Sequence, residues 1–310
     1  MATLQAAHQA THQAARHPDN ARPFESTEEE GWLCGPWRRP ANNSSHEAGT
    51  IHDDATAQGL GFRGGTVAGS IHMEQFVPLL LQAFGPDWQR TGSLSLWFRE
   101  PSVDGEAVQA MVQATGAGGQ HAVRMIRADG AEVLCGTATP GLDTHGALRQ
   151  RLAAMRPGEA PRMLARLRGG FQAAGLPTRV PHEDVQRRLP IITECLPAFS
   201  RAGEQAEAPL SAAVHALRVF EERLPVARSG FVGLFGGIEW QWLNGPMQVE
   251  RPYEVSGRVL AVTDSPRSEM LWTETVVRDP ARGHDVARML MLSRLLKQSS
   301  PLWTPLEAPR

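Results

Sequence analysis

Apolar residues follow two different periods in the first half of the chain, one helical and one alternating. In residues 70–85 they recur near the helical period, at Ile71, Phe76, Leu79, Leu80 and Phe84. This spacing predicts one long, largely buried helix over that stretch, in spite of Pro78. Residues 92–103 instead alternate apolar and polar side chains, which predicts a strand, and 106–116 and 132–141 show a similar alternation.

The second half repeats this order of elements. Residues 212–224 have the pattern of a helix, and 236–246 alternate Ile238, Trp240 and Trp242 with polar residues. Three further strands are expected at 253–265, 269–280 and 285–297. The simplest interpretation is an α+β fold built from a duplicated unit in tandem, each unit one helix on a mostly antiparallel sheet.

The composition sets the domain organisation and excludes some partners. We expect a mobile tail at 1–28, an N-terminal unit at 29–145, a linker region at 146–200 and a C-terminal unit at 201–310. The formal net charge of −2 makes nucleic acid an unlikely partner. The three cysteines are far apart, and no apolar run approaches the length of a membrane span, so we expect a cytoplasmic protein.

The loop "SSHEAGTIHDDATAQGLGFRGGTVAGS", residues 44–70, concentrates ionisable residues just before the predicted helix. His46 and His52 are six positions apart, so they would lie on nearly opposite faces of a helix and do not form a helical zinc motif. Asp53 and His46 are expected to be solvated. We therefore predict no metal site here.

Proton transfer requires only a carboxylate and an imidazole that face the same substrate atoms. Glu47 and His52 are five positions apart, and a turn at Gly49 would bring both into one pocket. Gly69 stands at the start of the predicted helix, where a backbone N–H can stabilise a developing oxyanion. These three residues are the candidate catalytic groups.

The same residues carry a resemblance to a known family. Glu47-x4-His52, Asp54, Ala57, Gly61-Phe62 and Gly69 are followed by Phe98, Pro101, Val103, Gly105 and Glu106. This order resembles the MaoC-like, (R)-specific enoyl-CoA hydratase family over about residues 40–140, and the C-terminal half resembles a degenerate copy. The resemblance implies a double hotdog fold, in which a sheet wraps a long helix. Glu47 stands where that family has aspartate, and Gly49-Thr50 stand where it has Asn-Pro.

The resemblance also implies an activity. Glu47 and His52 would hold a water molecule that adds to a 2-enoyl thioester of coenzyme A or acyl carrier protein. In the reverse direction they would eliminate water from a 3-hydroxyacyl thioester. Either reaction would make the protein a lyase of fatty acid metabolism. The N–H of Gly69 would polarise the thioester carbonyl, and no cofactor or metal is needed. Two alternatives stay open: a thioesterase, and a non-catalytic subunit that binds acyl thioesters.

Further candidates follow from position in the sequence. We expect substrate contacts from residues of the loop, the helix and the first strand of the N-terminal unit: Gly49, Asp54, Phe62, Ser70, His72 and Trp97. Capping of a helix or turn is the simpler role for Asp54, and a core or rim position for His72. His215 has no Glu-x4-His partner nearby, so the second half is interpreted as non-catalytic. Exposed sheet edges leave a homodimer open.

Overall fold

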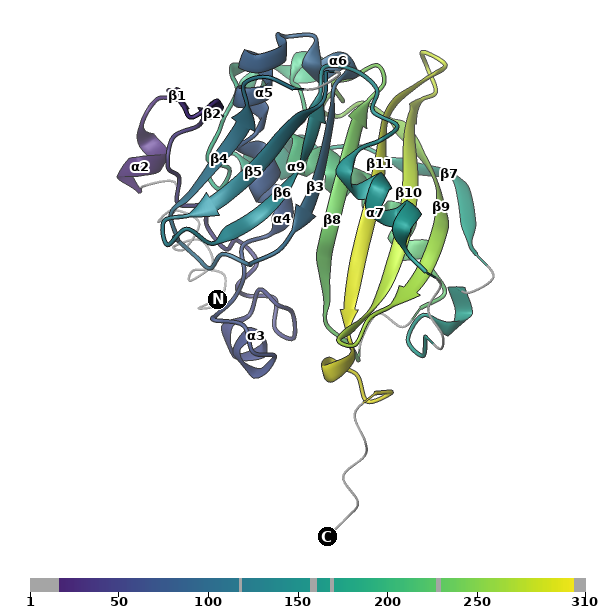
Figure 1. Ribbon diagram of the computed structural model, residues 1–310. Helices are drawn as coiled ribbons and strands as arrows, with labels where there is room; N and C mark the ends of the chain where they lie inside the picture. The colour runs from purple at the N-terminus through teal and green to yellow at the C-terminus, as the bar shows by residue number, and fades with distance from the viewer. Residues whose placement is uncertain (1–16, 117–118, 157–160, 168–169, 227–229, 304–310) are drawn as a thin grey trace.

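One continuous antiparallel sheet organises the fold. The computed structural model describes residues 17–116, 119–156, 161–167, 170–226 and 230–303. Within them, eleven strands pair in the order β1-β2-β4-β5-β6-β3-β8-β11-β10-β9-β7 (Figure 1). The strands are β1 (Thr27–Glu29), β2 (Trp32–Cys34), β3 (Ser93–Phe98), β4 (Val108–Gln113), β5 (His121–Arg127), β6 (Glu132–Thr139), β7 (Gln172–Thr178), β8 (Gly233–Trp242), β9 (Tyr253–Asp264), β10 (Ser268–Asp279) and β11 (His284–Leu296).

Short helices lie on both faces of this sheet. Figure 1 shows α4, α5 and α9 behind the sheet and α7 in front of it. The α-helices are α2 (Pro18–Ala21), α3 (Asp54–Gly59), α4 (Gly69–Glu74), α5 (Val77–Phe84), α6 (Trp88–Thr91), α7 (Ala147–Ala154), α8 (His182–Arg188) and α9 (Leu210–Leu217). The 3₁₀ helices are η1 (Ala165–Leu167), η2 (Pro197–Ser200), η3 (Gly203–Gln205), η4 (Arg218–Arg223) and η5 (Lys297–Ser299).

The two halves of the sheet have the same strand order. In the first half, β3 comes before β4, β5 and β6 in the sequence, but in the sheet it pairs with β6, the last of them. In the second half, β8 comes before β9, β10 and β11 and likewise pairs with the last of them, β11. The halves meet where β3 and β8 pair antiparallel, with Ser95 opposite Glu239 and Leu96 opposite Ile238. α4 of one half packs against α9 of the other on the face behind the sheet.

The alternation in the sequence places side chains as expected. Leu94 and Leu96 of β3 are fully buried, and so are Ile238 and Trp240 of β8. Trp242 is also in the core, as the alternation of residues 236–246 predicts for a half-buried strand. The other face is covered as well near the centre of the sheet, because α7 packs Leu148 against a separate cluster formed by Met270, Trp272, Leu290 and Leu292.

Two helix predictions need correction. The single helix expected over 70–85 is wrong, because the chain forms α4 and α5 with a break at Gln75 and Phe76. Pro78 lies in the first turn of α5, where its missing N–H costs no helical hydrogen bond. The helix expected over 212–224 is α-helical only as far as Leu217 and then continues as η4.

The predicted linker region and the described part of the predicted tail both contain secondary structure or tertiary contacts. Residues 146–200 contain α7, α8 and the edge strand β7, which pairs with β9. Much of the predicted tail, 1–16, lies outside the described residues. Asn20, from the described part of that tail, exchanges two hydrogen bonds of 2.8 Å with the backbone of Arg39. Both segments therefore contribute to the packed fold, and the domain boundaries themselves stay a prediction.

Candidate functional site

A cavity of about 2320 Å³ opens between the two halves of the molecule. It is larger than a typical small-molecule site of roughly 300–1,000 Å³, so it has room for an extended ligand. The first half contributes residues of the predicted loop, of α4 and of β3. The second half contributes residues of α8, α9, β8 and β11. A ligand in this cavity would contact elements far apart in the sequence.

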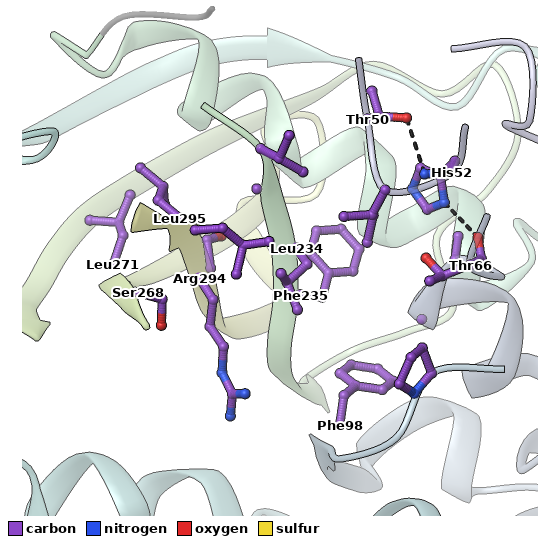
Figure 2. A pocket seen from close by; sticks show the side chains of 18 of the residues that line it. Thr50, His52, Thr66, Phe98, Leu234, Phe235, Ser268, Leu271, Arg294 and Leu295 are labelled. Carbon is purple, nitrogen blue, oxygen red and sulfur yellow. Dashed lines mark hydrogen bonds between the residues drawn. The ribbon is translucent and has the colours of Figure 1, made fainter. Parts of the chain in front are cut away.

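His52 lies at the side of the cavity with its ring orientation fixed. Its Nδ1 lies 2.7 Å from the backbone oxygen of Thr66, and its backbone N–H donates to Thr50 Oγ1 at 3.2 Å (Figure 2). A carbonyl oxygen can only accept a hydrogen bond, so Nδ1 carries a proton. Nε2 is therefore the ring nitrogen that is left to exchange a proton with a ligand.

The backbone around His52 is held in place from both sides. Its carbonyl accepts a 2.7 Å hydrogen bond from Asn42 Nδ2, and Thr66 N donates to the carbonyl of Ile51 at 2.9 Å. A Cβ on Gly65 would come within 2.2 Å of the carbonyl oxygen of His52. Glycine at position 65 is thus required for the close approach that fixes the imidazole.

Glu47 also borders the cavity. Residues 47–50 form a turn in which Thr50 N and Thr50 Oγ1 both donate to the carbonyl of Glu47, at 3.2 and 2.7 Å. Gly49 has a φ of +78°, a conformation that favours glycine. The side chain of Glu47 is exposed, and its charge acts on Arg218 across the cavity. The predicted turn at Gly49 is present.

Gly69 is the first residue of α4 and borders the cavity. Its backbone N–H has no acceptor within the helix, as is general for a first helical position. A Cβ at this position would lie 2.6 Å from Cζ of Phe98, so the ring of Phe98 excludes any larger residue. The glycine therefore has a packing role in addition to the proposed one at the substrate.

Two predicted substrate contacts are absent from the cavity wall. Asp54 does not border the cavity, and its Oδ1 accepts a 2.7 Å hydrogen bond from Gly65 N. The helix cap is Asp53, whose Oδ2 accepts from Thr56 N at 3.0 Å, so Asp54 does not cap the helix, and its structural role is instead the hydrogen bond to Gly65 N in the loop. Ser70 is fully buried and also lies away from the cavity wall. Asp54 is thus an exposed residue that holds the loop, and Ser70 is a core residue.

The remaining predicted contacts border the cavity in different surroundings. Phe62 lies at its wall near the loop. His72 is 2 % exposed, its Nε2 lies 2.9 Å from Ser102 Oγ, and burial lowers its pKa to about 4. Trp97 is on the other face of β3 from Phe98, with its ring between the guanidinium groups of Arg151 and Arg294. Trp97 is therefore not placed beside His52.

The second half contributes a histidine that sequence reasoning interpreted as non-catalytic. His215 of α9 borders the cavity, and its pKa is lowered to about 3. The causes are the protein atoms around the ring, then the charges of Arg188 and Arg218, and then that of His52. His215 is thus a neutral hydrogen-bonding group at neutral pH. The sequence pattern predicts that His215 lies on a helix, but its position relative to His52 depends on how α9 packs.

The described part of the chain shows two further absences. None of its helices has both the length and the apolar character needed to cross a membrane. It also contains no group of three or more His, Cys, Asp or Glu side chains placed to hold a metal ion.

Comparisons with known proteins identify the fold. No protein-family model matches the sequence, and no curated protein matches it. Among solved structures, a putative MaoC domain protein dehydratase from Chloroflexus aurantiacus J-10-fl matches with a TM-score of 0.52 at 10% identity, covering 90% of this chain and 99% of that one. A conserved hypothetical protein from Mycobacterium tuberculosis, described as having a double hotdog fold, matches with a TM-score of 0.51 at 12% identity, covering 89% and 97%.

A third match is the CurJ dehydratase, with a TM-score of 0.50 at 9% identity, covering 87% of this chain and 94% of that one. At these identities the likeness concerns the fold. The chain has the double hotdog fold seen in MaoC-like dehydratases, as the sequence resemblance implies.

Proposed function

We propose that this protein adds water to 2-enoyl thioesters, or removes it from 3-hydroxyacyl thioesters, in the cavity between its two halves. The observation that carries the proposal is the hydrogen bond from His52 Nδ1 to the carbonyl of Thr66, which leaves Nε2 of this cavity-lining histidine for proton transfer. Glu47 and Gly69 border the same cavity. This set supplies a base, an acid and a backbone N–H, which are the groups that the reaction needs.

In the elimination direction, neutral His52 takes the proton from the α-carbon of the substrate at Nε2. The N–H of Gly69 donates to the thioester oxygen and stabilises the negative charge that develops there. The bond between the β-carbon and its hydroxyl then breaks as Glu47, in its acid form, gives that oxygen a proton, and water leaves. Hydration is the reverse, with Glu47 as the carboxylate that deprotonates water and protonated His52 as the acid.

The hydrogen bond to Thr66 serves both directions. Nδ1–H stays on the carbonyl of Thr66 while Nε2 gains or loses the transferred proton, so the ring keeps its orientation through the cycle. After elimination His52 holds one more proton and Glu47 one fewer, so a proton must pass from His52 to Glu47 through solvent before the next turnover, and the balance over the whole cycle is zero.

The test uses crotonyl-CoA and the two enantiomers of 3-hydroxybutanoyl-CoA. Loss or gain of the conjugated double bond is followed by absorbance, and release of free thiol is followed in parallel. His52→Ala and Glu47→Gln should each lower the rate of double-bond conversion at least about a hundredfold, the range expected for general acid–base groups. His46→Ala is the matched control, because His46 is exposed and lies outside the cavity wall.

The outcomes separate the candidate functions. Thiol release without double-bond conversion would assign the site to a thioesterase, and thioester binding without either would assign it to a non-catalytic subunit. Full activity of the His52→Ala variant would refute the mechanism.

A further inference from the structure

Arg188 places an unpaired guanidinium at the cavity wall. It is the last residue of α8 and borders the cavity beside α9. Its Nε is buried and has no hydrogen-bond partner, and it takes part in no ion pair among the described residues. Other partly buried arginines differ in this respect: Arg251 forms an ion pair with Asp279, whereas the Nε of Arg294, which also borders the cavity, is buried without a partner.

No carboxylate of the described residues forms an ion pair with Arg188. Asp184, one turn earlier on α8, forms an ion pair with Arg187. Glu74 of α4 accepts a 2.6 Å hydrogen bond at Oε1 from the backbone of Ser211, its Oε2 is buried without a hydrogen-bond partner, and burial raises the pKa of this carboxyl. Burial also lowers the pKa of Arg188, against the opposing charges of Glu74 and Asp184. A partly buried guanidinium that lacks a hydrogen-bonded carboxylate has donors left for a ligand, so an anionic group entering the cavity would be bound favourably.

The position of Arg188 indicates which part of a substrate it meets. α8 packs against α9, which carries His215, and α9 packs against α4, which begins at Gly69, so the guanidinium lies at the end of the cavity that holds the proposed reacting groups. The phosphates of a coenzyme A or carrier-protein thioester are separated from the thioester by the whole pantetheine arm. An anion next to His215 is therefore better supplied by the acyl group than by the carrier.

We propose that the preferred substrates are thioesters whose acyl group ends in a carboxylate, and that Arg188 binds this carboxylate with His215 as a neutral neighbour. The inference rests on the proposed thioester function. It makes Arg188 a residue that determines specificity, contributed by the half of the chain that lacks the Glu47 and His52 loop. An aliphatic acyl group of the same length would leave the guanidinium unpaired.

The test measures binding of two saturated thioesters by calorimetry, glutaryl-CoA and pentanoyl-CoA, which differ only in a terminal carboxylate or methyl group. Neither can be hydrated, so the result is independent of catalysis. Wild-type protein should bind glutaryl-CoA at least about tenfold more tightly, as expected for a charge-assisted hydrogen bond. Arg188→Met should abolish this preference, and Arg188→Lys should keep part of it. Arg223→Met, at an exposed position outside the cavity wall, is the control.

Three results would overturn the inference. Equal affinity of wild-type protein for the two thioesters would exclude carboxylate recognition, whatever the folding of the variants. An equal loss of affinity for both thioesters in Arg188→Met would assign the guanidinium to a phosphate of the carrier. A preference for glutaryl-CoA that survives in Arg188→Met would assign it to another residue. Failure of the proposed function would instead appear as unchanged crotonyl-CoA, with the binding preference intact.

Discussion

Replacement of Gly69 by alanine tests the packing at the start of α4 and the site it borders. The added Cβ would lie 2.6, 2.9 and 3.0 Å from three atoms of the Phe98 ring. Carbon atoms in contact prefer about 3.5–4.0 Å, so the ring or the helix start must move by about 1 Å. Overpacking of this kind costs about 1–3 kcal/mol of unfolding free energy. A displacement on the order of 1 Å at a reacting group can lower a rate about a hundredfold.

The assay pairs urea unfolding with the rate of crotonyl-CoA hydration. We expect Gly69→Ala to lose both stability and activity, and the double variant Gly69→Ala/Phe98→Leu to recover most of the stability, because the shorter side chain removes the ring atoms that collide. Gly59→Ala is the control, since a Cβ there meets no atom within 4 Å. A Gly69→Ala variant with wild-type stability and rate would refute the close packing of Gly69 against Phe98.

Two further predictions concern stability. The pKa of His72 is lowered from 6.5 to about 4, so between these values the unfolded chain binds a proton that the folded protein does not, and folding is weakened as the pH falls. The loss of unfolding free energy from this effect is up to roughly 3 kcal/mol. In urea unfolding, wild type should therefore lose up to about that much more stability than His72→Gln between pH 7 and pH 4. Parallel pH profiles of the two proteins would contradict the prediction. Asp54→Ala should lower the unfolding free energy by about 1–3 kcal/mol, measured by thermal unfolding, because Gly65 N–H loses its acceptor. Asp54→Asn, which keeps an acceptor oxygen, should cost less. An unchanged melting temperature for Asp54→Ala would show that this hydrogen bond contributes nothing to stability.

The strands could be predicted in most cases because their signal is local. Alternation at Leu94 and Leu96, or at Ile238 and Trp240, records which side chains face the core, and the structure buries all four. The edge strand β7 carries no such alternation, with Gly175 and Pro177 inside it, and it forms because β9 offers a partner. The helix of residues 70–85 was misjudged because its apolar spacing continues through Pro78, while the backbone begins a new helix there.

The sequence by itself determined the order of elements and the loop that carries Glu47, His52 and Gly69, since the spacing of polar residues and glycines is a property of a short stretch of chain. Only the tertiary structure decided which nitrogen of His52 is basic, because the carbonyl that fixes it belongs to Thr66, fourteen residues away. Packing of α4 against α9 likewise decided that His215 and Arg188 border the same cavity as His52. A contact between distant segments depends on how whole elements pack, and no local pattern of residues records it.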